Sequence, residues 1–132
     1  MSNLQLRFVP RPDMANTCSE LSDQQFTVYS IERPLNAVDF FAQAKKRFPL
    51  DPPISGAVHW DAFADSISGG LDANPKSRIA LVIQDATPFQ VSHKPDFEMA
   101  LECLCEAAKE VEGLKRDDGH EDASIVIVVG VD

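Results

Sequence analysis

Residues 59–70 have the sequence HWDAFADSISGG, which predicts a short helix with two unlike faces. At about 100° per residue, the apolar side chains of this stretch fall on one side of the helix and its carboxylates on the other. The side that predicts contact with a core consists of Trp60, Phe63, Ala64, Ile67 and Leu71. The opposite side consists of Asp61, Asp65, Ser68 and Asp72. This acidic side is either a solvated face or a surface that meets a positively charged partner.

The segments around this helix predict a parallel sheet. Residues 78–83 and 124–129 are almost continuously apolar, which is typical of strands buried on both faces. Residues 26–31 are rich in β-branched and aromatic side chains and predict another strand. Helical patterns separate these strands, and helical crossovers connect parallel strands. We therefore expect an α/β fold with a small three-stranded parallel sheet and about three to four helices.

Two further helices have clear start or end signals. Asn36 offers a side-chain cap to a helix whose last turn carries Lys45, Lys46 and Arg47, where positive charge complements the helix dipole. Pro95 suits the first turn of a longer helix. The stripe of that helix that predicts core contact is Phe97, Leu101, Leu104, Ala108 and Val111, and its opposite side carries Glu102, Glu106 and Glu110. We expect a loop over residues 84–94, and we expect Gly69 and Gly70 to end the helix of residues 59–70.

The sequence pattern of the first 24 residues differs from that of the rest and predicts an N-terminal extension ahead of a domain over residues 25–132. Alternation of apolar and polar side chains over residues 4–9 could add an edge strand to the sheet. Pro10 and Pro12 end this pattern, and the polar stretch up to Gln25 predicts a partly loose segment.

Composition and charge exclude several classes of protein. The chain has 132 residues, 21 acidic and 12 basic side chains, and a net charge of −9. This balance repels phosphate backbones, so we expect no nucleic-acid partner, and it favours either a basic partner or simple solubility. No apolar run approaches the roughly 18 residues that span a membrane. Three cysteines without an export signal predict reduced thiols and a cytoplasmic location.

No catalytic, cofactor or metal constellation stands out in the sequence, and we expect none. His59, Asp61 and Asp65 leave open a small metal-dependent enzyme, but one helix supplies both carboxylates and no second segment offers ligands at suitable spacing. Cys103 and Cys105 point about 200° apart on a helix and predict structural thiols.

The acidic helix, placed before an apolar strand, a helix with Glu106-Ala107 and a closing strand of Ile and Val, resembles the barstar family of intracellular ribonuclease inhibitors. The resemblance covers roughly residues 26–131. It implies that Asp65 is a central anion at the position of a substrate phosphate, Asp61 a second acidic contact and Glu106 a peripheral charge pair. It also implies packing contacts from the loop over residues 54–59. The implied partner-binding residues are Ile54, His59, Asp61, Asp65, Ser68, Gly69 and Glu106.

From the charge pattern and this resemblance, we expect a bacterial inhibitor or immunity protein, monomeric when free, that blocks a basic ribonuclease or another nuclease toxin of a toxin–antitoxin pair. Ile54, Ser55, Ala64 and Gly70 stand where the family often has aromatic residues, so the partner could be a different nuclease. A regulatory or scaffold domain that kept the fold but binds another protein is the other open alternative.

Overall fold

A computed structural model describes residues 5–54 and 59–132 and contains one parallel sheet. Its strands are β1 (Leu6–Pro10), β2 (Thr27–Ile31), β3 (Arg78–Ile83) and β4 (Ser124–Val131), in the order β1-β4-β3-β2. All three neighbouring pairs are parallel. The expected strands after residue 25 are therefore confirmed, and the two central ones, β3 and β4, are the two apolar runs that predict burial on both faces.

The sheet has one strand more than the expected three, because β1 of the N-terminal segment pairs along its full length with β4. Leu6 is in register with Ile127 and Pro10 with Val131. The possible edge strand is thus present, and it covers an edge of β4 that would otherwise be open.

The segment after β1 is a helix rather than a loose extension. A short 3-10 turn (η1, Arg11–Asp13) leads into α1 (Met14–Asp23). Met14 and Leu21 of α1 are buried against the face of the sheet formed by Ala80, Val82, Val126 and Val128. Only a few apolar residues of α1 carry this contact, which is why its polar sequence gives so weak a helix signal.

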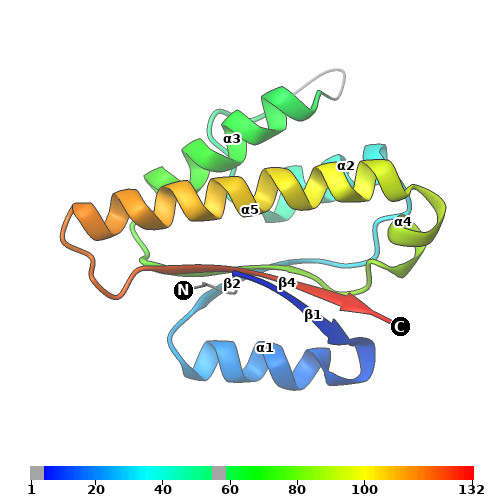
Figure 1. Cartoon of the computed structure of the whole chain (residues 1–132), viewed down its shortest axis with the longest axis horizontal. Helices are drawn as coiled ribbons and strands as arrows, with labels where there is room; N and C mark the ends of the chain where they lie inside the picture. The colour runs from blue at the N-terminus through cyan, green and yellow to red at the C-terminus, as the bar shows by residue number, and fades with distance from the viewer. Residues whose placement is uncertain (1–4, 55–58) are drawn as a thin grey trace.

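The other face of the sheet is covered by α2 (Ala37–Arg47), α3 (Trp60–Ala73), α4 (Thr87–Ser92) and α5 (Lys94–Asp117). Figure 1 shows these four helices on one side of the sheet and α1 on the other. The described residues thus form five α-helices, one more than the upper end of the expected range, and α4 occupies part of the expected loop over residues 84–94. The main core lies between these helices and the sheet, and its largest fully buried side chains include Phe40, Phe41, Phe63 and Phe89.

The helix signals of the sequence are largely confirmed. The Asn36 side chain accepts a hydrogen bond from the backbone N–H of Asp39 at 2.8 Å and so caps α2. Pro95 lies in the first turn of α5. The stripe of α5 that predicts core contact is buried throughout, as Phe97, Leu101, Leu104, Ala108 and Val111 show.

Gly69 and Gly70 do not end α3, which continues to Ala73. A Cβ on Gly70 would overlap the carbonyl oxygen of Pro49, and one on Gly69 would overlap that of Asp51. The two glycines therefore allow the chain before α3 to cross closely over the helix. Glycine often ends a helix because it tolerates the left-handed backbone conformation found there. Here the two glycines are needed for their small size within the helix.

Candidate acidic protein-binding site

The expected two-faced helix is α3. Phe63, Ile67 and Leu71 are fully buried, whereas Asp61 and Asp65 are exposed. Trp60, at the start of α3, packs against the core, with its ring centroid 4.5 Å from that of Phe41. The helix is thus held by its apolar side and presents its carboxylates on the surface, as its sequence predicts.

A row of carboxylates lies on the neighbouring helix. Glu102, Glu106 and Glu110 of α5 are exposed, opposite the buried stripe of the same helix. The groove between α3 and α5 has a volume of about 250 Å³ and is lined by Ala64, Asp65, Ser68, Cys103, Glu106, Ala107 and Glu110. The structure therefore brings three expected site residues together, namely Asp65, Ser68 and Glu106.

Glu110 belongs to this groove although the resemblance assigns no role to it. It lies one helical turn after Glu106, so the spacing of four residues is the signal that places both on one face. Ala64 also lines the groove, and its short side chain leaves space between the two acidic rows.

The pKa of the Cys103 thiol is raised both by burial and by the negative charges around this groove. Burial is the largest cause that raises the pKa of Cys103, which reaches about 11. The next causes are the negative charges of Glu102, Glu106 and Asp61. Carboxylates from α3 and α5 thus act on one point, which makes this surface favourable for cations.

The remaining expected contacts lie near the start of α3. His59 is exposed and occupies the N-cap position, where its side chain makes no capping hydrogen bond. Ile54 is partly buried and, with Lys45, Phe48, Leu50 and Pro53, lines a small hollow beside the main core. Residues 55–58 of the expected contact loop lie outside the described residues. Gly69 is partly buried and faces the backbone of Asp51, so its role as a partner contact stays a prediction.

The segment before α3 is tied to the helix by hydrogen bonds as well as by close packing. The backbone N–H of Asp51 donates to the carbonyl oxygen of Ser66 at 2.9 Å. The hydroxyl of Ser66, which is buried, donates to the carbonyl oxygen of Pro52. Together with the contacts of Gly69 and Gly70, these bonds fix the path by which the chain approaches α3.

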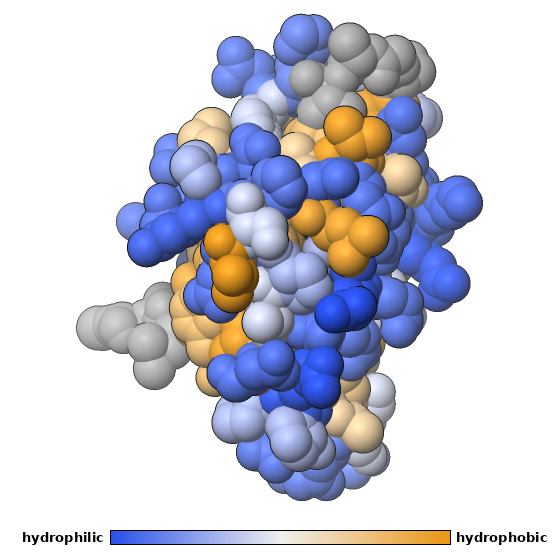
Figure 2. All heavy atoms as spheres, turned by 90° about the vertical axis from the view of Figure 1, so that its right-hand side faces the viewer, coloured by the Kyte–Doolittle hydropathy of each residue, from blue (hydrophilic) through white to orange (hydrophobic). Residues whose placement is uncertain are grey.

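A different surface lies at the end of the sheet where the strands finish. Figure 2 looks onto this end and shows a mostly hydrophilic surface with separate apolar patches. Because hydrophilic residues divide these patches, this end of the described structure offers no single broad apolar docking face.

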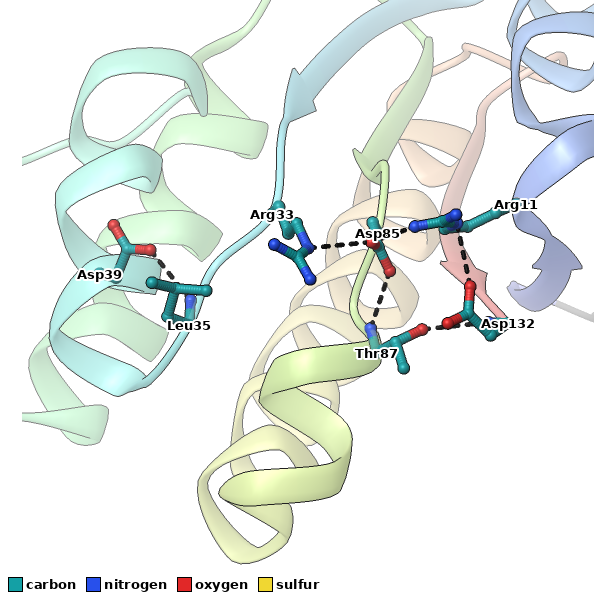
Figure 3. Close-up of polar contacts among 7 residues, drawn as sticks. All are labelled: Arg11, Arg33, Leu35, Asp39, Asp85, Thr87 and Asp132. Carbon is teal, nitrogen blue, oxygen red and sulfur yellow. Dashed lines mark hydrogen bonds and ion pairs between the residues drawn. The ribbon is translucent and has the colours of Figure 1, made fainter.

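The same end carries a charged cluster that the sequence patterns do not predict. Figure 3 shows Asp85, just after β3, between Arg11 and Arg33, which follow β1 and β2. Asp85 Oδ2 lies 2.8 Å from an Arg11 guanidinium nitrogen and 3.2 Å from Arg33 Nε, and Oδ1 accepts the Thr87 N–H at 3.1 Å. Arg11 Nε also lies 2.9 Å from an oxygen of Asp132, after β4. Residues that are distant in sequence meet here because parallel strands end at one edge.

These contacts lower the pKa of Asp85. Burial, the largest single cause, raises that pKa, but the hydrogen bonds from Arg11 and Thr87 and the charge of Arg11 together outweigh it. Both arginines are engaged with one carboxylate, so the cluster joins the strand ends and we assign it no ligand.

The open alternative of a metal-dependent enzyme gains no geometric support. Among residues 5–54 and 59–132, no three side chains of His, Cys, Asp or Glu converge in a way that could hold a metal ion. His59, Asp61 and Asp65 extend along the surface of one helix and receive no ligand from a second described element.

The fold and the site together define an α/β protein whose candidate site is an acidic surface on two packed helices. The family model for barstar, the barnase inhibitor, matches residues 24–128. The chain belongs to the barstar family. Comparison with curated proteins and with solved structures finds no match. Each helix among residues 5–54 and 59–132 is too short or too polar to span a membrane.

Proposed function

We propose that this protein is an inhibitor, or immunity protein, that binds a basic ribonuclease or another nuclease toxin and blocks its active site. The observation that carries this proposal is the convergence of two acidic rows, on α3 and α5, at one groove. Membership of a family of ribonuclease inhibitors and the net charge of −9 support it. The inhibitor would act by occlusion and would need no catalytic group of its own.

Each carboxylate of the site has a distinct task in this proposal. Asp65 lies in the groove and would occupy the place of a substrate phosphate among the cations of the nuclease. Asp61, one helical turn earlier and exposed, would make a second acidic contact. Glu106 would form a charge pair at the side of the interface, with Glu110 beside it. Ser68 supplies a polar group in the groove, and Ile54, His59 and Gly69 would be contacts around the start and middle of α3.

The charge of the surface also predicts how the partners meet. A negatively charged inhibitor attracts a basic nuclease over a distance comparable to the Debye length, about 8 Å at physiological salt. The association rate constant should therefore fall steeply as ionic strength rises, with a weaker effect on dissociation.

The test is inhibition of purified basic ribonucleases, with barnase as the first probe, followed by binding measurements on single variants. Asp65→Ala should weaken binding most, by at least about thirtyfold, or about 2 kcal/mol, the scale of an interface hot spot. Asp61→Ala should weaken it less. Glu20→Ala removes the same charge from α1, on the opposite face of the sheet, and should leave binding nearly unchanged. Wild-type affinity in the Asp65→Ala variant would overturn this mechanism.

A regulatory or scaffold domain is the second candidate, because Ile54, Ser55, Ala64 and Gly70 stand at positions where the family often has aromatic residues. It predicts that basic ribonucleases keep full activity in the presence of the chain.

The metal-dependent alternative predicts calorimetric binding of Mg²⁺, Mn²⁺ or Zn²⁺ that Asp61→Asn abolishes. Absence of such binding would remove that alternative.

A further inference from the structure

The strand β2 forms one edge of the sheet, with β3 as its only neighbour in the described structure. Ile31 is in register with Ile83, and its carbonyl oxygen accepts a hydrogen bond from Gln84 N–H at 2.9 Å. In a parallel pair, every second residue directs both backbone groups toward the same neighbour. Val28 and Ser30 therefore present their N–H and C=O groups at the open edge. Such a row of backbone groups is a template for another strand.

A pocket opens beside this edge, between β2 and α2. Its volume is about 340 Å³, larger than that of the groove between α3 and α5. It is lined by Ser30, Ile31, Glu32, Gln43, Lys46 and Arg47. The side-chain oxygen of Gln43 accepts a hydrogen bond from the backbone N–H of Glu32 at 2.9 Å. This bond occupies the edge of the chain just after β2. A segment that adds to the edge would therefore lie beside β2 itself, with its side chains within reach of the pocket.

The pocket carries a net positive charge, opposite to that of the acidic site, because Lys46 and Arg47 outnumber Glu32 in its lining. Lys45, Lys46 and Arg47 follow one another in the last turn of α2, and all three are exposed. The ion pairs found among the described residues use Arg11, Arg33 and Arg116, not these three cations. In a chain with only 12 basic residues, this is a concentrated positive patch. No residue lines both the pocket and the acidic groove.

We propose that the open edge of β2, together with Lys46 and Arg47 of the pocket beside it, binds an extended acidic segment of another protein by strand addition. Backbone pairing with Val28 and Ser30 would give the segment its direction and register, and Lys46 and Arg47 would select acidic side chains. A second copy of this chain fits less well, because joining two β2 edges would bring two positive patches together. A basic nuclease would be repelled, so this partner differs from the one proposed for α3 and α5.

The experiment uses the whole chain and a labelled peptide of about eight residues that alternates Glu with Val and Thr, long enough to cover β2. Binding is followed by fluorescence anisotropy, and hydrogen exchange by NMR identifies the edge. We expect the peptide to bind and to slow the exchange of the Val28 and Ser30 amides. A peptide with Lys in place of Glu should not bind. The same acidic peptide with N-methyl groups on consecutive amides should lose binding, because neither of its edges can then pair with β2.

Two double variants separate the site from the overall charge. Lys46→Glu with Arg47→Glu should weaken peptide binding at least about tenfold. Lys76→Glu with Lys94→Glu changes the net charge equally at exposed positions outside the pocket, and should change affinity by less than about twofold. Equal losses in the two double variants would overturn the proposal. So would the absence of binding at millimolar peptide, protection of amides away from β2, or self-association of the free chain through this edge.

Discussion

At the scale of single residues, the pKa of the Cys103 thiol depends on the carboxylates of both acidic rows and can be measured. Glu106 contributes to the raised pKa of Cys103, so Glu106→Gln should lower that pKa by a fraction of a unit, whereas Glu20→Gln on the far face should not. The measurement is the ultraviolet absorbance of the thiolate against pH, in a background of Cys18→Ser and Cys105→Ser. An unchanged Cys103 pKa in Glu106→Gln would contradict the convergence of charge at the groove.

The same thiol has a consequence for stability at high pH. A raised folded-state pKa means that the stabilising contribution is complete below the ordinary thiol pKa of about 8.5 and is lost as pH rises toward about 11.

Asp85 should dominate the electrostatic stability at the strand ends. Asp85→Asn keeps the shape of the side chain but removes the charge that two arginines share, and should cost about 1–3 kcal/mol of unfolding free energy at neutral pH. Because the folded-state pKa of Asp85 is lowered, its contribution is present above the ordinary carboxyl pKa of about 4 and is lost as pH falls through the lowered value. Urea unfolding at several pH values measures this difference.

The matched control is Glu121→Gln, which neutralises an exposed carboxylate in the loop after α5. It should change the unfolding free energy by less than about 0.5 kcal/mol. If the difference between wild type and Asp85→Asn stayed constant down to acidic pH, the assigned role of the charge would be wrong.

At the scale of elements, residues 49–52 cross closely over α3, a contact that no local sequence pattern predicts. Gly70→Ala should destabilise the protein by about 2–3 kcal/mol, because its Cβ would meet the backbone of Pro49, which cannot move like a flexible side chain. Gly113→Ala is the matched change in α5, where a Cβ has no neighbour within 4 Å, and should stabilise the helix by about 0.5–1 kcal/mol. Thermal and urea unfolding measure both. A neutral Gly70→Ala would show that the crossing is loose.

At the scale of the whole molecule, the N-terminal segment completes the sheet and covers its second face. The boundary near residue 24 stays a prediction, and the match to the family model begins at this residue. A chain of residues 25–132 would expose the cluster around Val82 and Val126 and reopen the edge of β4. We expect it to lose at least about 3 kcal/mol of unfolding free energy, since Met14 and Leu21 alone each bury a large apolar side chain.

Leu21→Ala in the full chain distinguishes packing from chain length in this experiment. It keeps β1 and the connecting helix and should cost about 2–4 kcal/mol. If residues 25–132 unfolded at the same urea concentration as the full chain, the N-terminal segment would be a separable extension.

Local patterns in the sequence were enough for the elements that bury a continuous stripe or a whole strand. The runs of β3 and β4, the two faces of α3 and the buried stripe of α5 follow from side-chain periodicity, which depends only on neighbours in the chain. The exposure of Asp61, Asp65 and Glu106 follows from the same periodicity.

The tertiary structure alone decided how these faces meet. The pairing of Leu6 with Ile127, the crossing of residues 49–52 at Gly70 and the shared carboxylate of Asp85 join residues that are far apart in sequence, and no local pattern encodes such contacts. The packing of α3 on α5 likewise turned two separate acidic faces into one groove. Periodicity determines which side of a helix faces outward, but the partner of that side is set by the packing of the whole chain.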